Sequence, residues 1–187
     1  SFKKFTNEDQ LVKKITDYLL KDKIVALYNG RSEFGERALG RRSIISMANK
    51  SESKNLINSK IKYREDYRPF APICLQKNAS KYFEVDDDYQ CQSMEKVVKV
   101  REKYFENLQA ICHFDNSARL QTLDNKSNML IAKILNYLGP IDIIRVLINT
   151  SFDLNGEPNV EHVDDAIRTF YASGIDHLVL ENNILSK

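Results

Sequence analysis

The sequence lacks the motifs that most often reveal a metal site, a disulfide framework or a membrane anchor. It holds three cysteines but no C-x-x-C pair, which argues against a zinc site or a disulfide framework and fits a reducing compartment. No apolar run reaches the length of a membrane span, and Ser1–Lys4 does not open a signal peptide. We therefore expect a cytoplasmic chain with no membrane partner and no metal site of its own.

Neither sign of charge dominates the 187 residues. The formal net charge is +2, so no field over the whole surface would draw the protein to nucleic acid or to a membrane. Any basic site must therefore be local, and we do not expect nucleic acid as a partner. The chain does not begin with Met, and we expect it to be part of a longer polypeptide.

Internal repeats are absent as well, and apolar residues instead recur at helix and strand spacings. With 42% hydrophobic and 29% charged residues, the chain can build the core of one domain, 1–187. The alternation of elements predicts an α/β domain with a mixed sheet. The expected helices cover 7–21, 51–61, 78–83, 128–138 and 163–172, and the expected strands cover 24–28, 43–47, 73–75, 94–101, 107–114, 118–123, 143–148 and 177–180.

Glycine is scarce, yet three of the six glycines lie in residues 29–43, which we call the Gly/Arg loop. This loop follows an expected buried strand and holds Gly30, Gly35, Gly40, Arg31, Arg37, Arg41 and Arg42. Glycine lets backbone approach a ligand closely, and the planar fork of arginine fits phosphate or carboxylate oxygens two at a time. The loop is not a P-loop, because Glu36 and Arg37 replace the required Lys and Ser/Thr. Two interpretations fit it equally, an anion site or a surface turn whose arginines pair with Glu33 and Glu36.

A second basic cluster follows, formed by Lys60, Lys62, Arg64 and Arg68. In extended chain Lys62 and Arg64 would point to one face. Composition alone favours a solvated basic edge of a strand over a ligand site.

Polar, turn-forming residues gather at two further places. His113 and Asp115 flank an expected turn, where a hydrogen-bonded structural histidine is the commoner outcome. Residues 149–158 follow an expected strand, and their hydroxyl and amide groups suit phosphate oxygens or a ribose as well as ordinary turns. The acidic run 86–88 is typical of a solvated loop.

Five blocks, in order, resemble the carbamoyltransferases of nodulation-factor and antibiotic O-carbamoylation, and the match runs from about residue 24 to residue 187. Residues 30–43 resemble the family's G-R-S-E-F-G-P-R-A-L-G-x-R-S. The other four blocks are K-x-R-x-x-x-R-P-F-A-P at 62–72, H-x-D-G-T-A-R-x-Q-T at 113–122, N-T-S-F-N-x-x-G-E-P at 149–158, and the closing helix and strand from 165.

The resemblance implies a YrdC-like twisted mixed sheet with flanking helices and a basic concave face. It also implies that carbamoyl phosphate and ATP, with Mg²⁺ on the nucleotide, form a carbamoyl adenylate on this domain. A Kae1-like N-terminal domain, absent from this chain and expected to hold Fe²⁺, would then transfer the carbamoyl group to an acceptor hydroxyl. A homodimer is compatible with this picture. The alternatives are an RNA- or nucleotide-binding YrdC-like module and a non-catalytic docking domain.

Carried over residue by residue, the resemblance predicts two groups of site residues. The expected catalytic residues are Arg31, Arg37, Lys62 and Arg64. The expected ATP and carbamoyl phosphate contacts are Gly30, Ser32, Gly35, Arg42, Ser43, Arg68, His113, Asp115, Arg119, Asn149, Thr150, Ser151 and Asp153.

Three positions depart from the family pattern. Glu36 stands in place of Pro, Asn116 in place of Gly, and Asp153 in place of the Asn of an S-x-N element. A carboxylate beside a phosphate is repulsive unless a cation neutralises it, so Asp153 needs such a partner. The whole interpretation requires several arginines and one lysine, distant in sequence, to converge on one pocket sized for two phosphate-bearing molecules.

Overall fold

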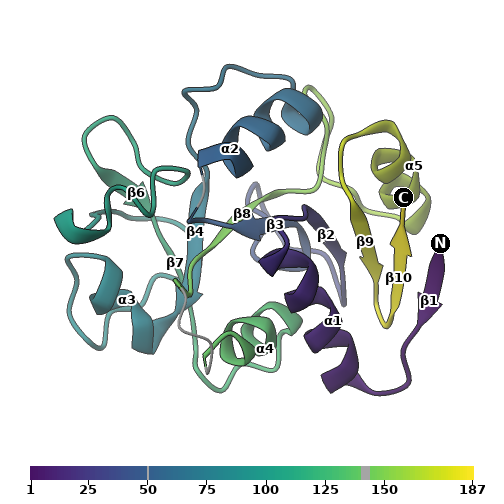
Figure 1. The fold of residues 1–187 in the computed structure, drawn as a ribbon, viewed down its shortest axis with the longest axis horizontal. Helices are drawn as coiled ribbons and strands as arrows, with labels where there is room; N and C mark the ends of the chain where they lie inside the picture. Colours follow the sequence, from purple (N-terminus) through teal and green to yellow (C-terminus); the bar gives the residue numbers. More distant parts are fainter. Residues whose placement is uncertain (50, 140–143) are drawn as a thin grey trace.

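A sheet of eight strands, in the order β1-β10-β9-β2-β3-β8-β4-β7, runs through the protein (Figure 1). The structure is a computed structural model that describes residues 1–49, 51–139 and 144–187, without the side chain of residue 51. Only the β2–β9 and β4–β7 pairs of this sheet are parallel. The strands are β1 Phe2–Lys4, β2 Val25–Tyr28, β3 Arg42–Met47, β4 Ala71–Leu75, β7 Gln121–Leu123, β8 Leu147–Ser151, β9 His177–Leu180 and β10 Asn183–Ser186.

Helices cover both faces of the sheet, so the protein has two apolar cores. Along β2, Val25 and Leu27 pack into one core, whereas Ala26 packs into the other, because successive side chains of a strand point to opposite faces. The first core is completed by α1 Glu8–Leu20 and α4 Leu130–Tyr137, which lie side by side in Figure 1. The second is completed by α2 Ser51–Ile57, the π-helix η1 Asn58–Lys62, α3 Gln76–Tyr82 and α5 Val163–Ala172.

A two-stranded sheet of β5 Val97–Lys99 and β6 Ser117–Arg119 lies apart from the main sheet. The edge strand expected over 94–101 is thus confirmed for its centre. The strand expected over 107–114 is wrong, because these residues form consecutive turns. Leu108, Ala110 and Ile111 are fully buried there. The apolar residues that suggested a strand are therefore buried in an irregular segment.

Other boundaries also differ from the prediction. The helix expected over 51–61 changes at Asn58 into η1, whose C-cap, Tyr63, has φ +45°. The expected strand over 143–148 begins at Leu147 and continues to Ser151, while residue 143 lies outside the described residues. The sequence pattern did not predict the short strands β1 and β10, which pair with each other.

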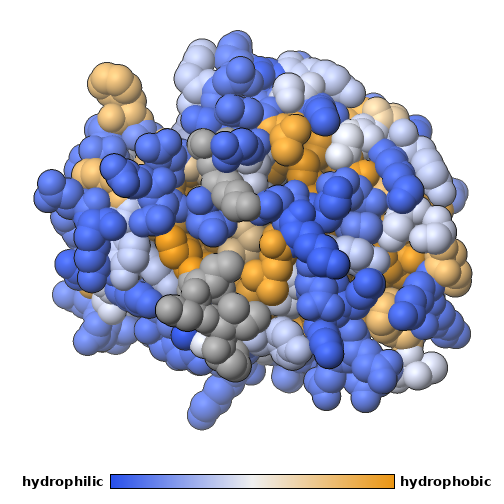
Figure 2. Space-filling view, viewed as in Figure 1, coloured by the Kyte–Doolittle hydropathy of each residue, from blue (hydrophilic) through white to orange (hydrophobic). Residues whose placement is uncertain are grey.

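Both ends of the chain lie on the same side of the molecule in Figure 1, where the Ser1 amino group donates to Ser186 O at 2.6 Å. On the face drawn in Figure 2, hydrophilic residues predominate and hydrophobic ones appear in small separate patches. None of the helices in the described part of the chain is both long and apolar enough to cross a membrane.

Candidate anion-binding site

Three guanidinium groups from distant parts of the chain line one cavity of about 160 Å³. Arg37 comes from the Gly/Arg loop, Arg64 follows η1, and Arg119 is the last residue of β6. The end of β8 and the start of β4 supply the remaining wall. The lining residues are Glu36, Arg37, Ala38, Arg64, Pro69, Phe70, Ala71, Met94, Arg119, Asn149, Thr150 and Ser151.

The positively charged groups that line the cavity are partly buried from water. Burial lowers the pKa of Arg119, and the neighbouring charge of Arg37 lowers it further. Burial likewise lowers the pKa of Arg64, with Arg68 as the next cause. Each shift means that the charged form is disfavoured by its surroundings. A bound anion would oppose both shifts, because a nearby opposite charge favours the charged form of arginine.

Arg64 is held in place by its neighbours. Its Nε donates to Asn58 Oδ1 at 2.8 Å, and its guanidinium lies over the Phe70 ring, 4.7 Å from the centroid. Asn58 in turn donates through Nδ2 to Arg68 O at 3.1 Å. One edge of the guanidinium is therefore used for support, which leaves the terminal nitrogens for a ligand.

Glu33 organises the Gly/Arg loop from within. Its Oε1 accepts hydrogen bonds from Leu39 N at 2.7 Å and Arg41 N at 2.8 Å, and the same carboxylate accepts from Arg42 N. The pairing of Glu33 with arginine side chains, one of the two alternatives, is therefore wrong, whereas the pairing expected for Glu36 is confirmed, because Arg37 Nη2 lies 3.8 Å from Glu36 Oε2. Three backbone N–H groups bend around one carboxylate, and this fold of the loop carries Arg37 to the cavity.

Gly40 is needed for the same bend. Its φ is +111°, and a Cβ there would lie 2.8 Å from Ile131 Cγ2 on α4. Its N–H donates to Ser43 Oγ at 2.9 Å, so the predicted ligand residue Ser43 supports the loop and is itself fully buried.

Arg42 also supports the loop. Its Nη2 donates to Gly30 O at 2.9 Å and its Nη1 to Asn29 O at 3.3 Å, with the guanidinium 3.6 Å from the centroid of the Tyr28 ring. It is 4% exposed and does not line the cavity.

Asn149 and Gln121 connect the loop to the sheet. Asn149 Nδ2 donates to Ala38 O at 3.0 Å and to Gln121 Oε1 at 2.7 Å. Gln121 Nε2 donates to Leu39 O at 3.1 Å. Two buried amides on β7 and β8 thus fix the backbone next to Arg37.

Lys62 lies at the end of η1 and its ammonium group contacts the chain that leaves β8. The Nζ atom donates to Ser151 O at 2.8 Å and to Asp153 O at 3.0 Å, and it lies 3.1 Å from Asp153 Oδ2. The carboxylate that departs from the family pattern therefore has a cation of its own. Burial lowers the pKa of Lys62, and Asp153 opposes that shift.

The structure thus divides the predicted site residues into three groups, while their roles remain predictions. Those that line the cavity are Arg37, Arg64, Arg119, Asn149, Thr150 and Ser151. Those whose hydrogen bonds or ion pairs hold the surrounding backbone are Gly30, Arg42, Ser43, Lys62 and Asp153. Those that lie outside the cavity lining, without such contacts to its walls, are Arg31, Ser32, Gly35, Arg68, His113 and Asp115.

The last group includes a local turn. Asp115 accepts from Ser117 N at 3.1 Å and from the Ser117 hydroxyl, and it pairs with Lys99 at 3.1 Å. His113 Nδ1 lies 3.1 Å from the Ser117 hydroxyl oxygen. These contacts agree with the structural interpretation of the histidine.

Sequence reasoning did not assign Glu33, Met94 or Gln121 to the site. Glu33 and Gln121 lie within the family blocks 30–43 and 113–122, but the motifs do not indicate what either side chain contacts. Met94 is the first residue of the strand expected over 94–101, but it lies before β5 in an irregular segment, with φ +57°.

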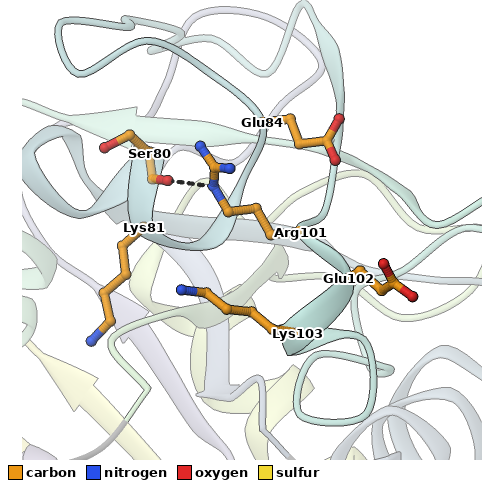
Figure 3. Close-up of a pocket in the computed structure, with 6 residues that line it drawn as sticks. All are labelled: Ser80, Lys81, Glu84, Arg101, Glu102 and Lys103. Carbon is orange, nitrogen blue, oxygen red and sulfur yellow. Dashed lines mark hydrogen bonds between the residues drawn. The ribbon is translucent and has the colours of Figure 1, made fainter.

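A second depression, about 610 Å³, lies between α3 and the 3₁₀ helix η2 Glu102–Tyr104 (Figure 3). It is lined by charges of both signs, Lys81, Lys103 and Arg101 with Glu84 and Glu102. Arg101 Nε donates to Ser80 O at 2.7 Å, and in Figure 3 the two carboxylates point away from the two lysines. None of the predicted site residues lies here. Among the described residues no group of three or more His, Cys, Asp or Glu could hold a metal ion.

Fold and site together define an α/β domain that gathers three arginines around a small cavity. Residues 16–187 match the family model described as "Carbamoyltransferase C-terminus", and the chain belongs to that family.

Relatives with functional names agree with this assignment. The chain is 42% identical over 173 residues to nodulation protein NolO of Bradyrhizobium diazoefficiens, covering 92% of this chain and 32% of that protein. It is 35% identical over 154 residues to 3'-hydroxymethylcephem-O-carbamoyltransferase of Streptomyces clavuligerus, covering 82% of this chain and 29% of that protein. The chain thus spans about a third of the length of these relatives.

Solved structures show the same fold. HypF in a phosphate- and nucleotide-bound form matches 99% of this chain and 22% of its own, with a TM-score of 0.58 at 17% identity. HypF of T. kodakarensis matches 93% of this chain and 20% of its own, with a TM-score of 0.59 at 13% identity. The fold class predicted from the sequence, a YrdC-like mixed α/β sheet with flanking helices, is confirmed.

Proposed function

We propose that this chain is the carbamoyl-activating part of an ATP-dependent O-carbamoyltransferase. The observation that carries the proposal is the convergence of Arg37, Arg64 and Arg119 on one cavity. Carbamoyl phosphate is a compact dianion, and planar guanidinium groups match its phosphate oxygens. The family membership and the similarity to the cephem O-carbamoyltransferase support the choice of a carbamoyl compound.

The cavity does not fit the expectation that one pocket, lined by arginines and a lysine, holds both phosphate-bearing substrates, because it is small and Lys62 does not line it, so we propose different places for the two substrates. A volume of about 160 Å³ lies below the ~300–1,000 Å³ of cavities that enclose drug-sized ligands. The cavity therefore suits carbamoyl phosphate, and ATP is too large to share it. We place the ATP phosphates on the solvent side of Arg37, whose side chain is 47% exposed.

The reaction proposed for this site consumes one water molecule. Carbamoyl phosphate, ATP and water give carbamoyl adenylate, phosphate and pyrophosphate, because a carbamate oxygen must replace pyrophosphate on the α-phosphorus. Developing charge on the leaving phosphates is what the arginines would stabilise. Phosphoryl and adenylyl transfer depend mostly on positioning and charge neutralisation, so a nucleophilic side chain is not required.

In this proposal the metal ions and the second half-reaction are supplied by the nucleotide and by the rest of the polypeptide. Mg²⁺ would enter with ATP, bound mainly by its phosphates. The chain covers only 32% of NolO and 29% of the cephem enzyme. The remainder of such a polypeptide, expected to contain a Kae1-like domain with Fe²⁺, would carry out the transfer to the acceptor hydroxyl.

An RNA-binding role has less support. The net charge is +2, and the clustered arginines line a small cavity. RNA binding would instead require an exposed basic surface.

The test is ligand-dependent stability combined with product release. Carbamoyl phosphate at millimolar concentration should raise the thermal midpoint of the chain, and ATP with Mg²⁺ should raise it further. Pyrophosphate should appear only when both substrates are present. A midpoint that neither substrate moves, together with no pyrophosphate, would contradict the proposed function.

A further inference from the structure

One wall of the cavity carries a buried hydrogen-bond acceptor that no protein group uses. Asn149 is 1% exposed, yet its Oδ1 has no hydrogen-bond partner among the described residues. Asn149 lines the cavity, and because its Oδ1 is closed to water in this structure, a ligand donor reaches that atom only when a neighbouring side chain shifts. A buried polar atom without a partner costs free energy, so such an atom at a ligand site calls for an explanation.

The surroundings fix which end of the amide carries the oxygen. Asn149 Nδ2 lies 3.0 Å from the backbone oxygen of Ala38, which can only accept a hydrogen bond. The Gln121 amide is oriented in the same way, because its Nε2 lies 3.1 Å from Leu39 O. Gln121 Oε1 therefore faces Asn149 Nδ2 at 2.7 Å as an acceptor. Turning the Asn149 amide over would place oxygen against two acceptors, so the oxygen must be the atom left without a partner.

An acceptor among arginines requires a ligand that is anionic and also has an N–H or O–H donor. We propose that Asn149 Oδ1 accepts a hydrogen bond from the NH₂ group of carbamoyl phosphate, and that this contact selects a carbamoyl group over an acyl group. The inference rests on the proposed function and adds to it the residue that determines specificity. The three arginines bind the phosphate of either kind of mixed anhydride, and only the carbamoyl compound satisfies Asn149.

Acetyl phosphate is the matched probe, because it carries a methyl group where carbamoyl phosphate carries NH₂ and has the same phosphate. A site that hydrogen-bonds an N–H group rejects an analogue without it, since the buried acceptor is then left unpaired. We expect the chain to bind carbamoyl phosphate about tenfold more tightly than acetyl phosphate in titration calorimetry. Inorganic phosphate, titrated in parallel, should bind less tightly than carbamoyl phosphate.

The variant Asn149→Leu tests the residue directly. It removes the acceptor at similar volume, and the ratio of the two affinities should fall to about one. A merely structural role of Asn149 would weaken both ligands equally and leave the ratio unchanged. Where Asn149→Leu does not fold, Asn149→Ser removes the amide oxygen with less apolar surface at the site.

Thr122→Val is the control for a lost buried hydrogen bond. Thr122 is 1% exposed and its Oγ1 accepts from Cys91 N at 2.8 Å, away from the cavity lining. This variant should lose stability and keep the wild-type ratio.

The possible failures are distinguishable. Equal binding of carbamoyl and acetyl phosphate by the wild type would overturn the role of Asn149 and leave anion binding intact. Phosphate that binds as tightly as carbamoyl phosphate would also overturn it, because a P–OH donor would then suffice. Absence of binding by all three ligands would overturn the proposed function as well.

Discussion

Lys62 and Asp153 form an ion pair, 3.1 Å from Nζ to Oδ2, next to the chain that leaves the cavity wall at Ser151. The side chains are 5% and 18% exposed. The same Nζ donates to the carbonyl oxygens of both Ser151 and Asp153. An ammonium group has three protons, so these contacts leave none for a substrate phosphate. We infer from this geometry that Lys62 positions Ser151, whereas the resemblance to the family motif predicts a direct ligand.

A double-mutant cycle decides between these two roles. Lys62→Met should cost about 3 kcal/mol in the free energy of unfolding, because it leaves the Asp153 carboxylate buried without its cation. Lys62→Met with Asp153→Asn should recover a substantial part of that loss and part of the affinity for carbamoyl phosphate. Chemical denaturation and calorimetry measure both. A double variant that is as weak a binder as Lys62→Met alone would show that the lysine contacts the phosphate.

The Glu33 carboxylate should control the shape of the Gly/Arg loop more than the stability of the whole protein. Glu33→Gln replaces one acceptor oxygen with an NH₂ group that faces backbone N–H donors. We expect roughly a tenfold loss of carbamoyl phosphate affinity, since hydrogen bonds to a charged acceptor are among the stronger ones. Hydrogen exchange at Leu39 and Arg41 should accelerate. Unchanged exchange at these two amides would show that the loop holds its shape without Glu33.

Gly40 and Gly35 form a matched pair for separating backbone strain from packing. Both have positive φ, +111° and +123°, but a Cβ at Gly35 meets no atom within 4 Å, whereas one at Gly40 lies 2.8 Å from Ile131 Cγ2. Gly40→Ala should therefore be about 1–3 kcal/mol less stable than Gly35→Ala in chemical denaturation. Equal losses in the two variants would mean that the loop shifts easily away from α4.

Asp115 should make folding sensitive to acid. Hydrogen bonds from Ser117, followed by one from Lys99, lower the pKa of Asp115 from 3.8 to about 2. The unfolded chain binds the proton more readily, so this contribution to stability is fully present above about pH 4 and is lost as pH falls towards 2. Asp115→Asn should flatten the stability profile within that window and leave the slope above it unchanged. An identical acid limb in wild type and variant would contradict the assigned pKa.

The sequence predicted most helices and the buried strands, because period and burial coincide there. The prediction failed at 107–114, where Leu108 and Ile111 are buried in turns. Apolar spacing there reflects burial and not regular secondary structure. The site shows the same division. The motifs named Arg37, Arg64 and Arg119, but which atoms meet depends on contacts across the sheet that no local pattern encodes. Arg42 and Lys62 have side chains of the kind that bind anions, yet both donate hydrogen bonds to carbonyl oxygens of the surrounding loops.

The affinity for carbamoyl phosphate of single arginine variants tests the convergent cavity most directly. Arg37→Gln, Arg64→Gln and Arg119→Gln should each weaken binding about tenfold or more, since each removes a charged fork from the cavity. Arg168→Gln removes the same charge from α5, where the arginine pairs with Glu157 at 2.8 Å, and it should bind like the wild type. Four variants with the same affinity, whether reduced or unchanged, would contradict a shared anion site at these three arginines.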